Sequence, residues 1–469
     1  MAKKITKTES WKIITSTKKR NQSDARPQLT TVKRTNIKSD SSSIRLTSRM
    51  ASMALSPTKS DPSMTQSVST ALHMKFNFTL RSDKDGKQRP PSRQEAGAII
   101  SAFPNCHAVG LSPPYLVLRF SQLPPKPWPL SAAGLPLYLT TDQYGDPEDF
   151  GLIGRAGTLS ITPSPVLWKT PTSAMIKEII QAYRTTYKTP ISSIAWLGTR
   201  FMVTPADAKA NLNELPSTIG RVLVTYRNSE PKGREAAQRA KQPLDQIHDD
   251  SNYGLTLRPG IMISCEAYED NETLTTAGIP VRSPDGELFI TVASHGFPLG
   301  LETVYHPNGN GSRIGEVKKK LWDTDISLAS LNEGISYSCD TFSSNILAGS
   351  TLRGFKRLED VLIGDNIFMD NPFSGLCEGQ VTMVEWANIP CDEDASELPW
   401  VGALWMYTGN GRTEPANGSC GSVIWDEEEN AIAFYRFSYD GGKSCAISVE
   451  PLIQMGMVIE PIKSSTNTL

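Results

Sequence analysis

The strongest constraint on the fold is a series of short β-type runs in the C-terminal half of the chain. Between residues 256 and 469, runs rich in Val, Ile, Phe, Tyr and Trp alternate with turn residues, almost without helical periodicity. The runs are G-I-M-I-S-C (260–265), E-L-F-I-T-V-A-S (287–294), S-R-I-G-E-V (312–317), D-I-S-L-A-S-L (325–331), N-I-F-M (366–369), Q-V-T-M-V-E-W (380–386), A-L-W-M-Y-T (403–408), S-V-I-W (422–425) and A-I-A-F-Y-R-F (431–437). S-P-D-G-E (Ser283–Glu287) has the composition of a hairpin turn. Many short strands with little helix predict a β-sandwich or a pair of β-barrels.

The composition changes along the chain, whose 469 residues are enough for two or three domains. Residues 1–74 carry 14 Lys/Arg against 4 Asp/Glu and few aromatic side chains, so we expect a disordered basic tail there. Residues 75–227 have a globular composition and predict a small α+β domain, to which no motif assigns a role. The strongly polar residues 228–255 predict a linker, and residues 256–469 form the predicted β domain.

The middle region contains the clearest helical pattern of the chain. In Met175–Tyr187 the apolar side chains recur on one face, Thr172 can cap the start, and Pro190 follows the end. The other elements that we predict for this region are strands, at residues 98–103, 115–120, 193–203 and 221–227.

The cysteines and the hydropathy of the chain indicate which cellular compartment and which cofactors to expect. The seven cysteines have no regular spacing, and no CxxC pair or Cys/His cluster has the spacing of zinc ligands. We therefore expect no metal site and no cofactor. The N-terminus lacks the apolar core of a secretory signal, and the chain has no run of about eighteen apolar residues. These features predict an intracellular protein of the cytoplasm or nucleus, with reduced thiols, that is neither secreted nor inserted in a membrane.

Three reactive side chains stand at the ends of runs in the β domain. T-V-A-S-H-G-F places His295 at the end of an apolar strand, and D-T-D-I-S-L places Asp325 at the head of another. N-G-S-C-G-S-V-I-W (Asn417–Trp425) places Ser419 and Cys420 between two glycines, ahead of a further strand. Such a turn either presents a nucleophile or is an ordinary hairpin turn beside a buried cysteine. The turn alone does not decide between these interpretations.

The order of histidine, aspartate and nucleophile within one all-β region resembles the trypsin/chymotrypsin-like peptidases. In that family the histidine closes a T-A-A-H-C pattern, the aspartate opens D-I-A-L, and the nucleophile stands in G-D-S-G-G. Here the corresponding patterns are T-V-A-S-H-G (291–296), D-I-S-L (325–328) and G-S-C-G-S (418–422). With Cys420 in the nucleophile's place, the chain resembles the picornavirus-type cysteine peptidases, and it is also similar to trypsin-like domains of uncharacterised fungal proteins. The resemblance covers roughly residues 256–460 and implies a double β-barrel.

The resemblance also implies a role for each residue. Cys420 attacks as a thiolate, and His295 first takes a proton from it and later gives a proton to the leaving amine. Asp325 holds the tautomer of the histidine and supports its positive charge. The backbone N–H groups of Gly418 and Cys420 form the oxyanion hole.

Other residues compete for these roles. Asp323 lies two positions before the preferred aspartate, and His306 is a second histidine of the same region. Ser419 or Ser422 becomes the nucleophile if the alignment shifts by one or two residues.

Several positions depart from the family pattern. Gly296 replaces the cysteine that usually follows the histidine, and Ser419 replaces the aspartate that pairs with a new N-terminus after activation. Glu414 precedes the nucleophile by six residues, where a carboxylate selects basic substrate side chains. Arg436 lies on the strand that forms a wall of the substrate cleft, and we expect it to pair with Glu414 and close the pocket.

These observations predict an intracellular endopeptidase that hydrolyses a protein or peptide substrate through a Cys/His/Asp mechanism. The alternative is a catalytically inactive trypsin-like domain that binds proteins or peptides. A third interpretation is nucleic-acid binding by the basic tail, whose net charge is +10. Residues 256–469 carry 13 Lys/Arg against 30 Asp/Glu, so docking of the basic tail on this acidic domain of its own chain is a further expectation.

Overall fold

The computed structural model describes Leu46–Thr47 and, with gaps, residues 73–463. The described ranges are 46–47, 73–126, 128–142, 151–227, 256–265, 274–298, 300–307, 309–321, 324–342, 349–388, 400–411, 414–439 and 441–463. The predicted linker 228–255 lies outside them, as does the predicted basic tail apart from residues 46–47 and 73–74. The described part of the chain is mainly β, with three α-helices.

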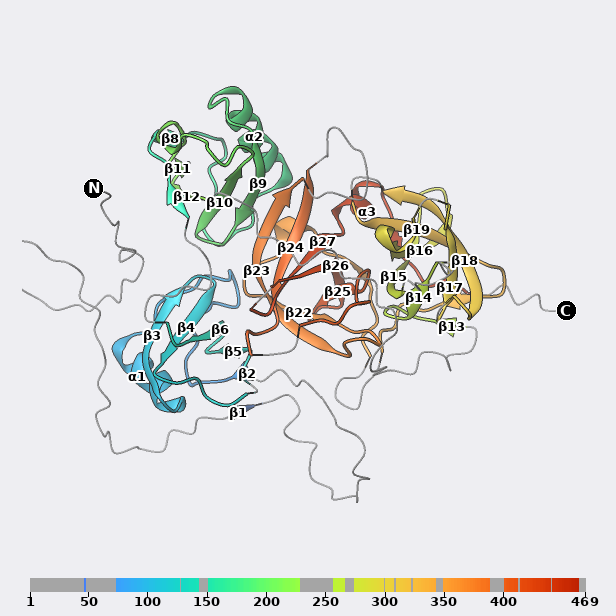
Figure 1. The fold of residues 1–469 in the computed structure, drawn as a ribbon, viewed down its shortest axis with the longest axis horizontal. Coiled ribbons are helices and arrows are strands. Elements are labelled where there is room, and N and C mark those ends of the chain that lie inside the picture. Colours follow the sequence, from blue (N-terminus) through green and yellow to red (C-terminus); the bar gives the residue numbers. More distant parts are fainter. Residues whose placement is uncertain are drawn as a thin grey trace, which may run out of the picture. The chain divides into compact units, whose positions relative to one another are not determined.

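Six antiparallel strands close into a first β-barrel (Figure 1). They are β14 (Met262–Ser264), β15 (Leu274–Arg282), β16 (Leu288–Ala293), β17 (Thr303–His306), β18 (Ser312–Leu321) and β19 (Ile326–Leu331). Strands are hydrogen-bonded in the order β14-β15-β16-β19-β18-β17, and β17 pairs again with β14. The predicted hairpin turn joins β15 to β16, where the N–H of Ser283 donates to the carbonyl of Glu287 at 2.8 Å.

A second antiparallel barrel repeats this pairing scheme (Figure 1). Its strands are β22 (Asn366–Met369), β23 (Cys377–Ala387), β24 (Val401–Tyr407), β25 (Val423–Asp426), β26 (Asn430–Tyr439) and β27 (Lys443–Ser448). The order is β22-β23-β24-β27-β26-β25, and β25 pairs again with β22. The predicted pair of β-barrels is therefore confirmed.

Apolar side chains of both barrels pack into one shared core. The first barrel contributes Ile279, Val281, Ile326 and Leu328, and the second contributes Phe368, Val423, Trp425 and Phe434. Burying a side chain of the size of Leu or Phe stabilises the fold by about 1.5–3 kcal/mol, so this core holds the two barrels against each other. Loops of the two barrels that meet at the edge of this core therefore keep a fixed position relative to each other.

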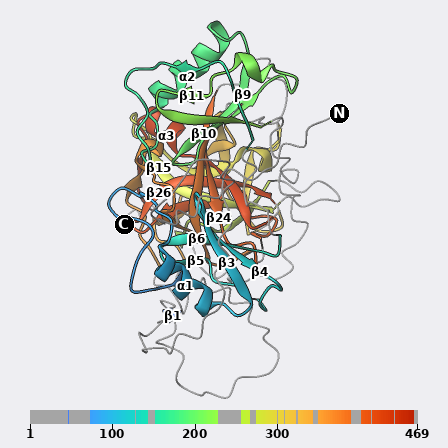
Figure 2. The same cartoon turned by 90° about the vertical axis from the view of Figure 1, so that its left-hand side faces the viewer.

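Residues 151–227 extend the sheet of the second barrel. Strand β9 (Ile191–Trp196) pairs antiparallel with β23, from Ser193 opposite Ala387 to Trp196 opposite Val384. The helix α2 (Ser173–Thr185) packs against β9, as Figures 1 and 2 show. The remaining elements of this segment are β7 (Leu152–Ile153), β8 (Thr158–Leu159), β10 (Arg200–Pro205), η1 (Leu212–Glu214), β11 (Thr218–Ile219) and β12 (Val222–Tyr226).

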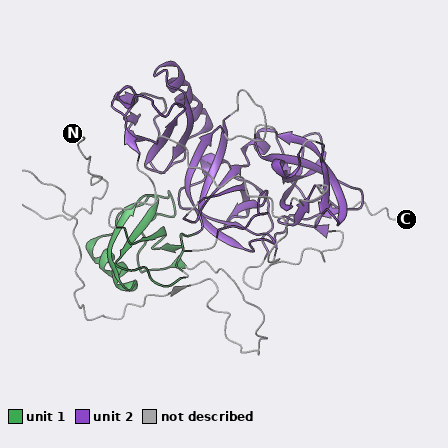
Figure 3. Cartoon of the chain, viewed as in Figure 1, with its two compact units in different colours: residues 1–150, 409–412 green, residues 151–408, 413–469 purple. Residues whose placement is uncertain are grey.

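The chain divides into two compact units (Figure 3). One unit holds residues 1–150 and 409–412, and the other holds residues 151–408 and 413–469, including both barrels. In the first unit a sheet of order β1-β2-β5-β6-β4-β3 is accompanied by one helix, α1 (Arg93–Ala102). Its strands are β1 (Leu46–Thr47), β2 (His73–Met74), β3 (Cys106–Ser112), β4 (Tyr115–Phe120), β5 (Ser131–Ala132) and β6 (Leu135–Thr140).

One predicted element of this unit is wrong. Residues 98–103 were expected to form a strand, but they belong largely to α1. The helix starts at a capping box, in which the hydroxyl of Ser92 accepts from the N–H of Glu95 and the Glu95 carboxylate accepts from the N–H of Ser92. This cap favours a helix over the strand that a short apolar run also permits.

The other predicted elements of the middle region are confirmed. α2 begins two residues before the predicted helix, and the Thr172 hydroxyl accepts from the N–H of Met175 at 3.3 Å. Predicted strands 115–120 and 221–227 correspond to β4 and β12, whereas the run 193–203 is divided into β9 and β10 by a turn.

The C-terminal segment returns to the first barrel. After α3 (Glu450–Gln454), the strand β28 (Val458–Ile459) pairs with β15, and Ile462 exchanges backbone hydrogen bonds with Tyr337. The remaining short elements are β13 (Thr256–Leu257), η2 (Ser294–Gly296), β20 (Ser336–Tyr337), β21 (Gly354–Phe355) and η3 (Leu358–Asp360).

Candidate active site

Strand pairing brings the predicted histidine and aspartate together. His295 lies in η2, immediately after β16, and Asp325 immediately precedes β19. Because β16 and β19 are paired antiparallel up to Ala293 opposite Ile326, the end of one strand meets the start of the other. Two residues 30 positions apart in sequence therefore become neighbours.

The carboxylate of Asp325 contacts the Nδ1 edge of the histidine ring. The His295 Nδ1 atom lies 2.8 Å from Oδ2 and 2.9 Å from Oδ1 of Asp325, and the backbone N–H of His295 donates to Oδ1 at 3.1 Å. Both side chains are buried, with exposed fractions of 7% for His295 and 8% for Asp325. With Nδ1 facing the carboxylate, Nε2 is the ring nitrogen left for a nucleophile.

Burial and neighbouring charges have opposite effects on the pKa values of His295 and Asp325. Burial disfavours the charged imidazole, but the charge of Asp325 and hydrogen bonds to Asp325 and Cys420 outweigh it and raise the pKa of His295 to about 9. Burial also disfavours the ionised carboxylate, but the positive charges of Arg436 and His295 outweigh it and hold the pKa of Asp325 below its usual range. The aspartate is therefore ionised at neutral pH, and the ring beside it binds a proton readily.

Two glycines shape the turn that carries Cys420. Gly421 has a φ of +89°, and a Cβ atom there would lie 2.3 Å from the carbonyl oxygen of Thr276. Gly418 has a φ of +97°, and a Cβ atom there would lie 2.6 Å from the ring of Phe373. The N–H of Thr276 donates to the carbonyl of Cys420 at 2.9 Å, and its hydroxyl donates to the carbonyl of Gly418 at 2.8 Å. Strand β15 thus anchors the turn at two points.

The thiol of Cys420 faces the histidine from this turn. Its side chain is close enough to His295 to raise the pKa of the ring, and its Sγ atom donates to the carbonyl oxygen of Arg436 at 3.3 Å. Only 1% of Cys420 is exposed. The structure therefore brings the three predicted catalytic residues together, with the histidine bonded to the aspartate and near the thiol.

The same turn presents backbone amides beside the thiol. Among the described residues, the N–H groups of Gly418 and Cys420 have no hydrogen-bond acceptor, whereas the N–H of Gly421 donates to Tyr435 at 3.0 Å. Two unengaged N–H groups next to a nucleophile are what an oxyanion hole requires. Both groups belong to residues for which the sequence predicted this role.

Arg436 lies on the aspartate side of the histidine. Its Nε atom is 3.1 Å from Oδ2 of Asp325, and its Nη1 atom contacts Nδ1 of His295. The guanidinium also stacks on Phe437, with Cζ 4.8 Å from the ring centroid. The predicted pair with Glu414 is not among the ion pairs of the described residues, since Arg436 pairs with Asp325 instead.

The hydroxyls of the two serines near Cys420 bond to residues other than His295. The hydroxyl of Ser419 lies 2.8 Å from that of Ser374 and donates to Oδ1 of Asn371 at 3.3 Å. The hydroxyl of Ser422 accepts from Nδ2 of Asn371 at 3.0 Å. Both serines are fully buried and tie the turn to the second barrel.

No contact with the thiol is found for the other alternative residues within the described part of the chain. The Nδ1 atom of His306 donates to the carbonyl of Met262 at 2.8 Å, which is a structural contact. Glu414 is partly buried. Asp323 lies outside the described residues.

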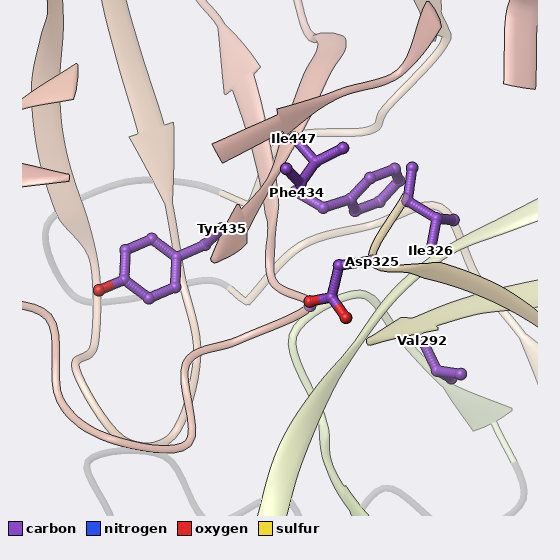
Figure 4. A pocket seen from close by; sticks show the side chains of 7 residues that line it. Val292, Asp325, Ile326, Phe434, Tyr435 and Ile447 are labelled. Atoms are coloured by element: carbon purple, nitrogen blue, oxygen red, sulfur yellow. The ribbon is translucent and has the colours of Figure 1, made fainter. Parts of the chain in front are cut away.

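A small cavity adjoins the aspartate between the two barrels, with room for about one water molecule. Figure 4 shows Ile326, Phe434 and Ile447 beside Asp325, with the ring of Tyr435 apart from them. The cavity is lined by Val292, Asp325, Ile326, Gly421, Phe434, Tyr435 and Ile447. A peptide side chain does not fit such a space, so we find no open substrate pocket at this point.

Two features together identify the fold. Both six-stranded barrels close with the same strand order, and the first supplies His295 and Asp325 while the second supplies the turn with Cys420. Strands β14 to β19 and β22 to β27 form a trypsin-like double β-barrel. No protein-family model and no curated protein matches the chain.

Several solved protease structures are similar to this chain over less than half of its length. The Nocardiopsis protease NAPase is 14% identical over 44% of this chain and 99% of its own, with a TM-score of 0.32. Thermobifida fusca protease A is 14% identical over 44% and 98%, with a TM-score of 0.33. The Cellulomonas bogoriensis chymotrypsin is 14% identical over 44% and 98%, with a TM-score of 0.31. The fold assignment itself rests on the strand pairing and on the position of the three residues.

Three further findings concern cofactors and compartment. No group of His, Cys, Asp or Glu within the described ranges is arranged to hold a metal ion. None of the helices that the structure describes is long and apolar enough to cross a membrane. The six described cysteines are free thiols.

Sequence reasoning missed one residue of the site and the partner of another. Asn371, which binds both serines of the turn, gives no local signal because it follows β22, about fifty positions earlier in the chain. Arg436 was placed on the correct strand, but its partner Asp325 was not foreseen. A charged side chain inside an apolar run, A-F-Y-R-F, was the available sign that a buried carboxylate faces it.

Proposed function

We propose that the protein is an endopeptidase that cleaves protein or peptide substrates with Cys420 as nucleophile. The observation that carries this proposal is the position of His295, whose Nδ1 atom bonds to the Asp325 carboxylate and whose pKa is raised by the neighbouring Cys420 side chain. A cysteine, a histidine and an orienting carboxylate in this relation activate a thiol for acyl transfer.

Each chemical step uses groups that are already in place. The Cys420 proton passes to Nε2 of His295, and the thiolate adds to the carbonyl carbon of the scissile peptide bond. The oxyanion that forms accepts hydrogen bonds from the N–H groups of Gly418 and Cys420. The imidazolium then protonates the amine, which leaves as the C–N bond breaks, and a thioester remains.

Hydrolysis of the thioester repeats these steps with water. His295 takes a proton from the water molecule while its oxygen adds to the thioester carbonyl. Collapse of the second oxyanion breaks the C–S bond, releases the carboxylic acid and returns the proton to Cys420. Throughout, Asp325 stabilises the imidazolium, because its own pKa is low and it remains ionised.

Reaction with a peptide-like thiol electrophile at neutral pH, followed by mapping of the modified cysteine, tests this proposal. We expect labelling at Cys420, its loss in Cys420→Ser, and a fall of at least about 100-fold in His295→Ala, the range of general-base catalysis. His306→Ala is the matched control, because it removes a buried histidine of the same barrel whose Nδ1 atom donates to the backbone carbonyl of Met262. Labelling of Cys420 no faster than that of the other cysteines would contradict the proposal.

A second candidate function is peptide or protein binding without catalysis. The burial of the site favours it, since 1% of Cys420 and 2% of Arg436 are exposed. In that case Cys420→Ala leaves the affinity for a bound peptide unchanged, and electrophiles do not select Cys420. The free thiols of the described residues also suit the reducing, intracellular compartment that we propose for the protein.

A further inference from the structure

Asn371 contacts the residues on both sides of the proposed nucleophile. Its Nδ2 atom donates to the hydroxyl of Ser422 at 3.0 Å, and its Oδ1 atom accepts from the hydroxyl of Ser419 at 3.3 Å. The asparagine is fully buried, and it lies just after β22 of the second barrel. Because Cys420 stands between these two serines, a single amide side chain fixes the chain before and after the thiol.

The same amide also fixes its own loop. Oδ1 of Asn371 accepts from the N–H groups of Phe373 and Ser374 at 3.0 and 2.9 Å. The hydroxyl of Ser374 in turn lies 2.8 Å from that of Ser419 and accepts from the N–H of Ala416 at 2.8 Å. The loop is therefore bonded to the nucleophile turn before the thiol as well as after it.

The aromatic ring of this loop packs against the first glycine of the turn. A Cβ atom at Gly418 would lie 2.6 Å from the ring of Phe373, so the ring occupies the space beside the glycine. Phe373 is itself buried with Met262 and Leu274 of the first barrel. A glycine has no side chain to limit the rotation of its peptide groups, so these surrounding contacts decide how the turn is oriented.

The bonds between this loop and the turn join neutral amide and hydroxyl groups. The trypsin-like family has an aspartate in the place of Ser419, which pairs with a new N-terminus after activation. Here Ser419 is bonded to Asn371 and Ser374 instead. Hydrogen bonds between neutral groups need no cationic partner, so the turn is held by the folded chain itself.

We propose that Asn371, partly through Ser374, is a positioning residue for the oxyanion hole: it holds the N–H groups of Gly418 and Cys420 in place before a substrate binds, without a charged N-terminus. The inference rests on the proposed function and goes beyond it, because it states what keeps the turn in its active conformation. Donors that are fixed in advance need no reorganisation when the oxyanion forms, which is the source of their contribution to catalysis.

The test compares two small reagents that make different demands on the turn, with the full-length chain. In p-nitrophenyl acetate the sulfur of Cys420 attacks the carbonyl carbon, an oxyanion forms, and nitrophenolate leaves as the C–O bond breaks. In iodoacetamide the sulfur attacks the methylene carbon, a C–S bond forms, and iodide leaves without an oxyanion. Each rate is taken as the part that is lost in Cys420→Ala.

We expect Asn371→Ala to lower the rate of acylation at least about tenfold, because the loss of one oxyanion-hole donor lowers turnover by about 100-fold or more. The rate of alkylation is expected to stay within about threefold of the wild type, because this reaction needs the thiolate but no oxyanion. An equal fall in both rates, or an unchanged rate of acylation, overturns the inference.

Asn366→Ala is the matched control. Asn366 is a partly buried asparagine on β22, where it accepts from Gln380 and donates to Glu427. Its removal costs a similar number of hydrogen bonds in the same barrel, and we expect the ratio of acylation to alkylation to remain that of the wild type. A fall of this ratio in Asn366→Ala as large as in Asn371→Ala contradicts a specific role of Asn371.

Ser374→Ala is a second and milder variant. It removes the acceptor of the Ala416 N–H and the bond to Ser419, but it keeps the amide of Asn371. We expect the ratio of acylation to alkylation to fall at least about threefold, in the range of one neutral hydrogen bond. Far-ultraviolet circular dichroism shows whether each variant folds, and if Asn371→Ala does not, the ratio in Ser374→Ala decides.

The experiment distinguishes the failure of this inference from the failure of the proposed function. If Cys420 is alkylated faster than the other cysteines, but both reagents respond equally to every variant, the peptidase proposal stands and the role of Asn371 is disproved. A wild type that is alkylated but not acylated at Cys420 has no working oxyanion hole, which also overturns the inference. If Cys420 reacts no faster than the other cysteines with either reagent, both proposals fail.

Discussion

The Sγ atom of Cys420 lies 3.3 Å from the carbonyl oxygen of Arg436 and donates a hydrogen bond to it. This bond belongs to a series through which β26 holds the nucleophile turn. The carbonyl of Tyr435 accepts from the N–H of Gly421 at 3.0 Å, and the N–H of Tyr435 donates to the carbonyl of Ser422 at 2.9 Å. The turn therefore has the second barrel on one side and β15 of the first barrel on the other.

Replacement of Gly421 by alanine is expected to disrupt this turn. The added Cβ atom would lie 2.3 Å from the carbonyl of Thr276, and the φ of +89° is one that alanine rarely adopts. We expect a loss of about 2–4 kcal/mol in the free energy of unfolding, together with loss of Cys420 labelling. Gly334→Ala is the matched control: its φ is +85°, but no atom lies within 4 Å of the added Cβ. Equal effects of the two substitutions on stability, measured by urea denaturation, contradict the steric explanation.

The hydroxyl of Ser419 provides a test of the choice of nucleophile. It is bonded to Ser374 and Asn371, away from the histidine, so Ser419→Ala is expected to leave the rate of Cys420 labelling within about twofold of the wild type. The lost hydrogen bonds lower the free energy of unfolding by about 1 kcal/mol. Labelling by mass spectrometry and thermal unfolding measure the two effects. A loss of labelling in a folded Ser419→Ala protein argues against Cys420 as the sole nucleophile.

The stability of the His295–Asp325 pair depends on pH in a defined window. The pKa of His295 rises from 6.5 in the unfolded chain to about 9, so its contribution is complete below pH 6.5 and is lost as the pH rises through 9. The pKa of Asp325 is lowered from 3.8, so its contribution is present above pH 3.8 and is lost as the pH falls through the folded value.

The corresponding measurement compares the wild type with His295→Gln by urea denaturation at pH 6 and pH 10. We expect an advantage of the wild type on the order of 3 kcal/mol at pH 6, because each pKa unit corresponds to about 1.4 kcal/mol, and a much smaller advantage at pH 10. Asp426→Asn, a change at a buried aspartate that pairs with Lys356, serves as the control without a histidine. A difference between wild type and His295→Gln that grows with pH contradicts the sign of the pKa shift.

The three central residues were predictable because each has a local signature. His295 ends an apolar run, Asp325 begins one, and Cys420 stands in a glycine turn, so their order in the chain was sufficient to propose a shared site. The β-barrels were predictable for the same reason, since alternation and turn residues are local patterns.

Contacts between distant segments were not predictable in this way. The apolar run of β26 indicates that Arg436 is buried, but it does not show which carboxylate across the barrel faces it. The pairing of β9 with β23, nearly two hundred positions apart, has no local signal at all. The helix α1 was missed for another reason: its capping residues Ser92 and Glu95 are visible in the sequence, but the apolar run that follows also suits a strand.

A buried ion pair secures the junction between residues 151–227 and the second barrel. Arg227, after β12, pairs with Glu385 on β23, and Nε1 of Trp405 donates to the same carboxylate at 2.7 Å. Since both charged side chains are at least nine-tenths buried, Glu385→Gln leaves the guanidinium without a counter-charge in a medium of low polarity. We expect a loss of about 3–5 kcal/mol in the free energy of unfolding.

The matched control for this junction is Glu429→Gln, which removes the partner of Arg353 on the surface, where 74% of the arginine side chain is exposed. That substitution is expected to cost less than about 1 kcal/mol, because exposed ion pairs contribute little. Urea denaturation of both variants gives the comparison, and hydrogen exchange shows where the loss occurs. We expect the amides of β9 to exchange faster in Glu385→Gln, because this strand joins the appended sheet to β23. Unchanged exchange in β9, with stability reduced by less than about 1 kcal/mol, contradicts a role of the ion pair at this junction.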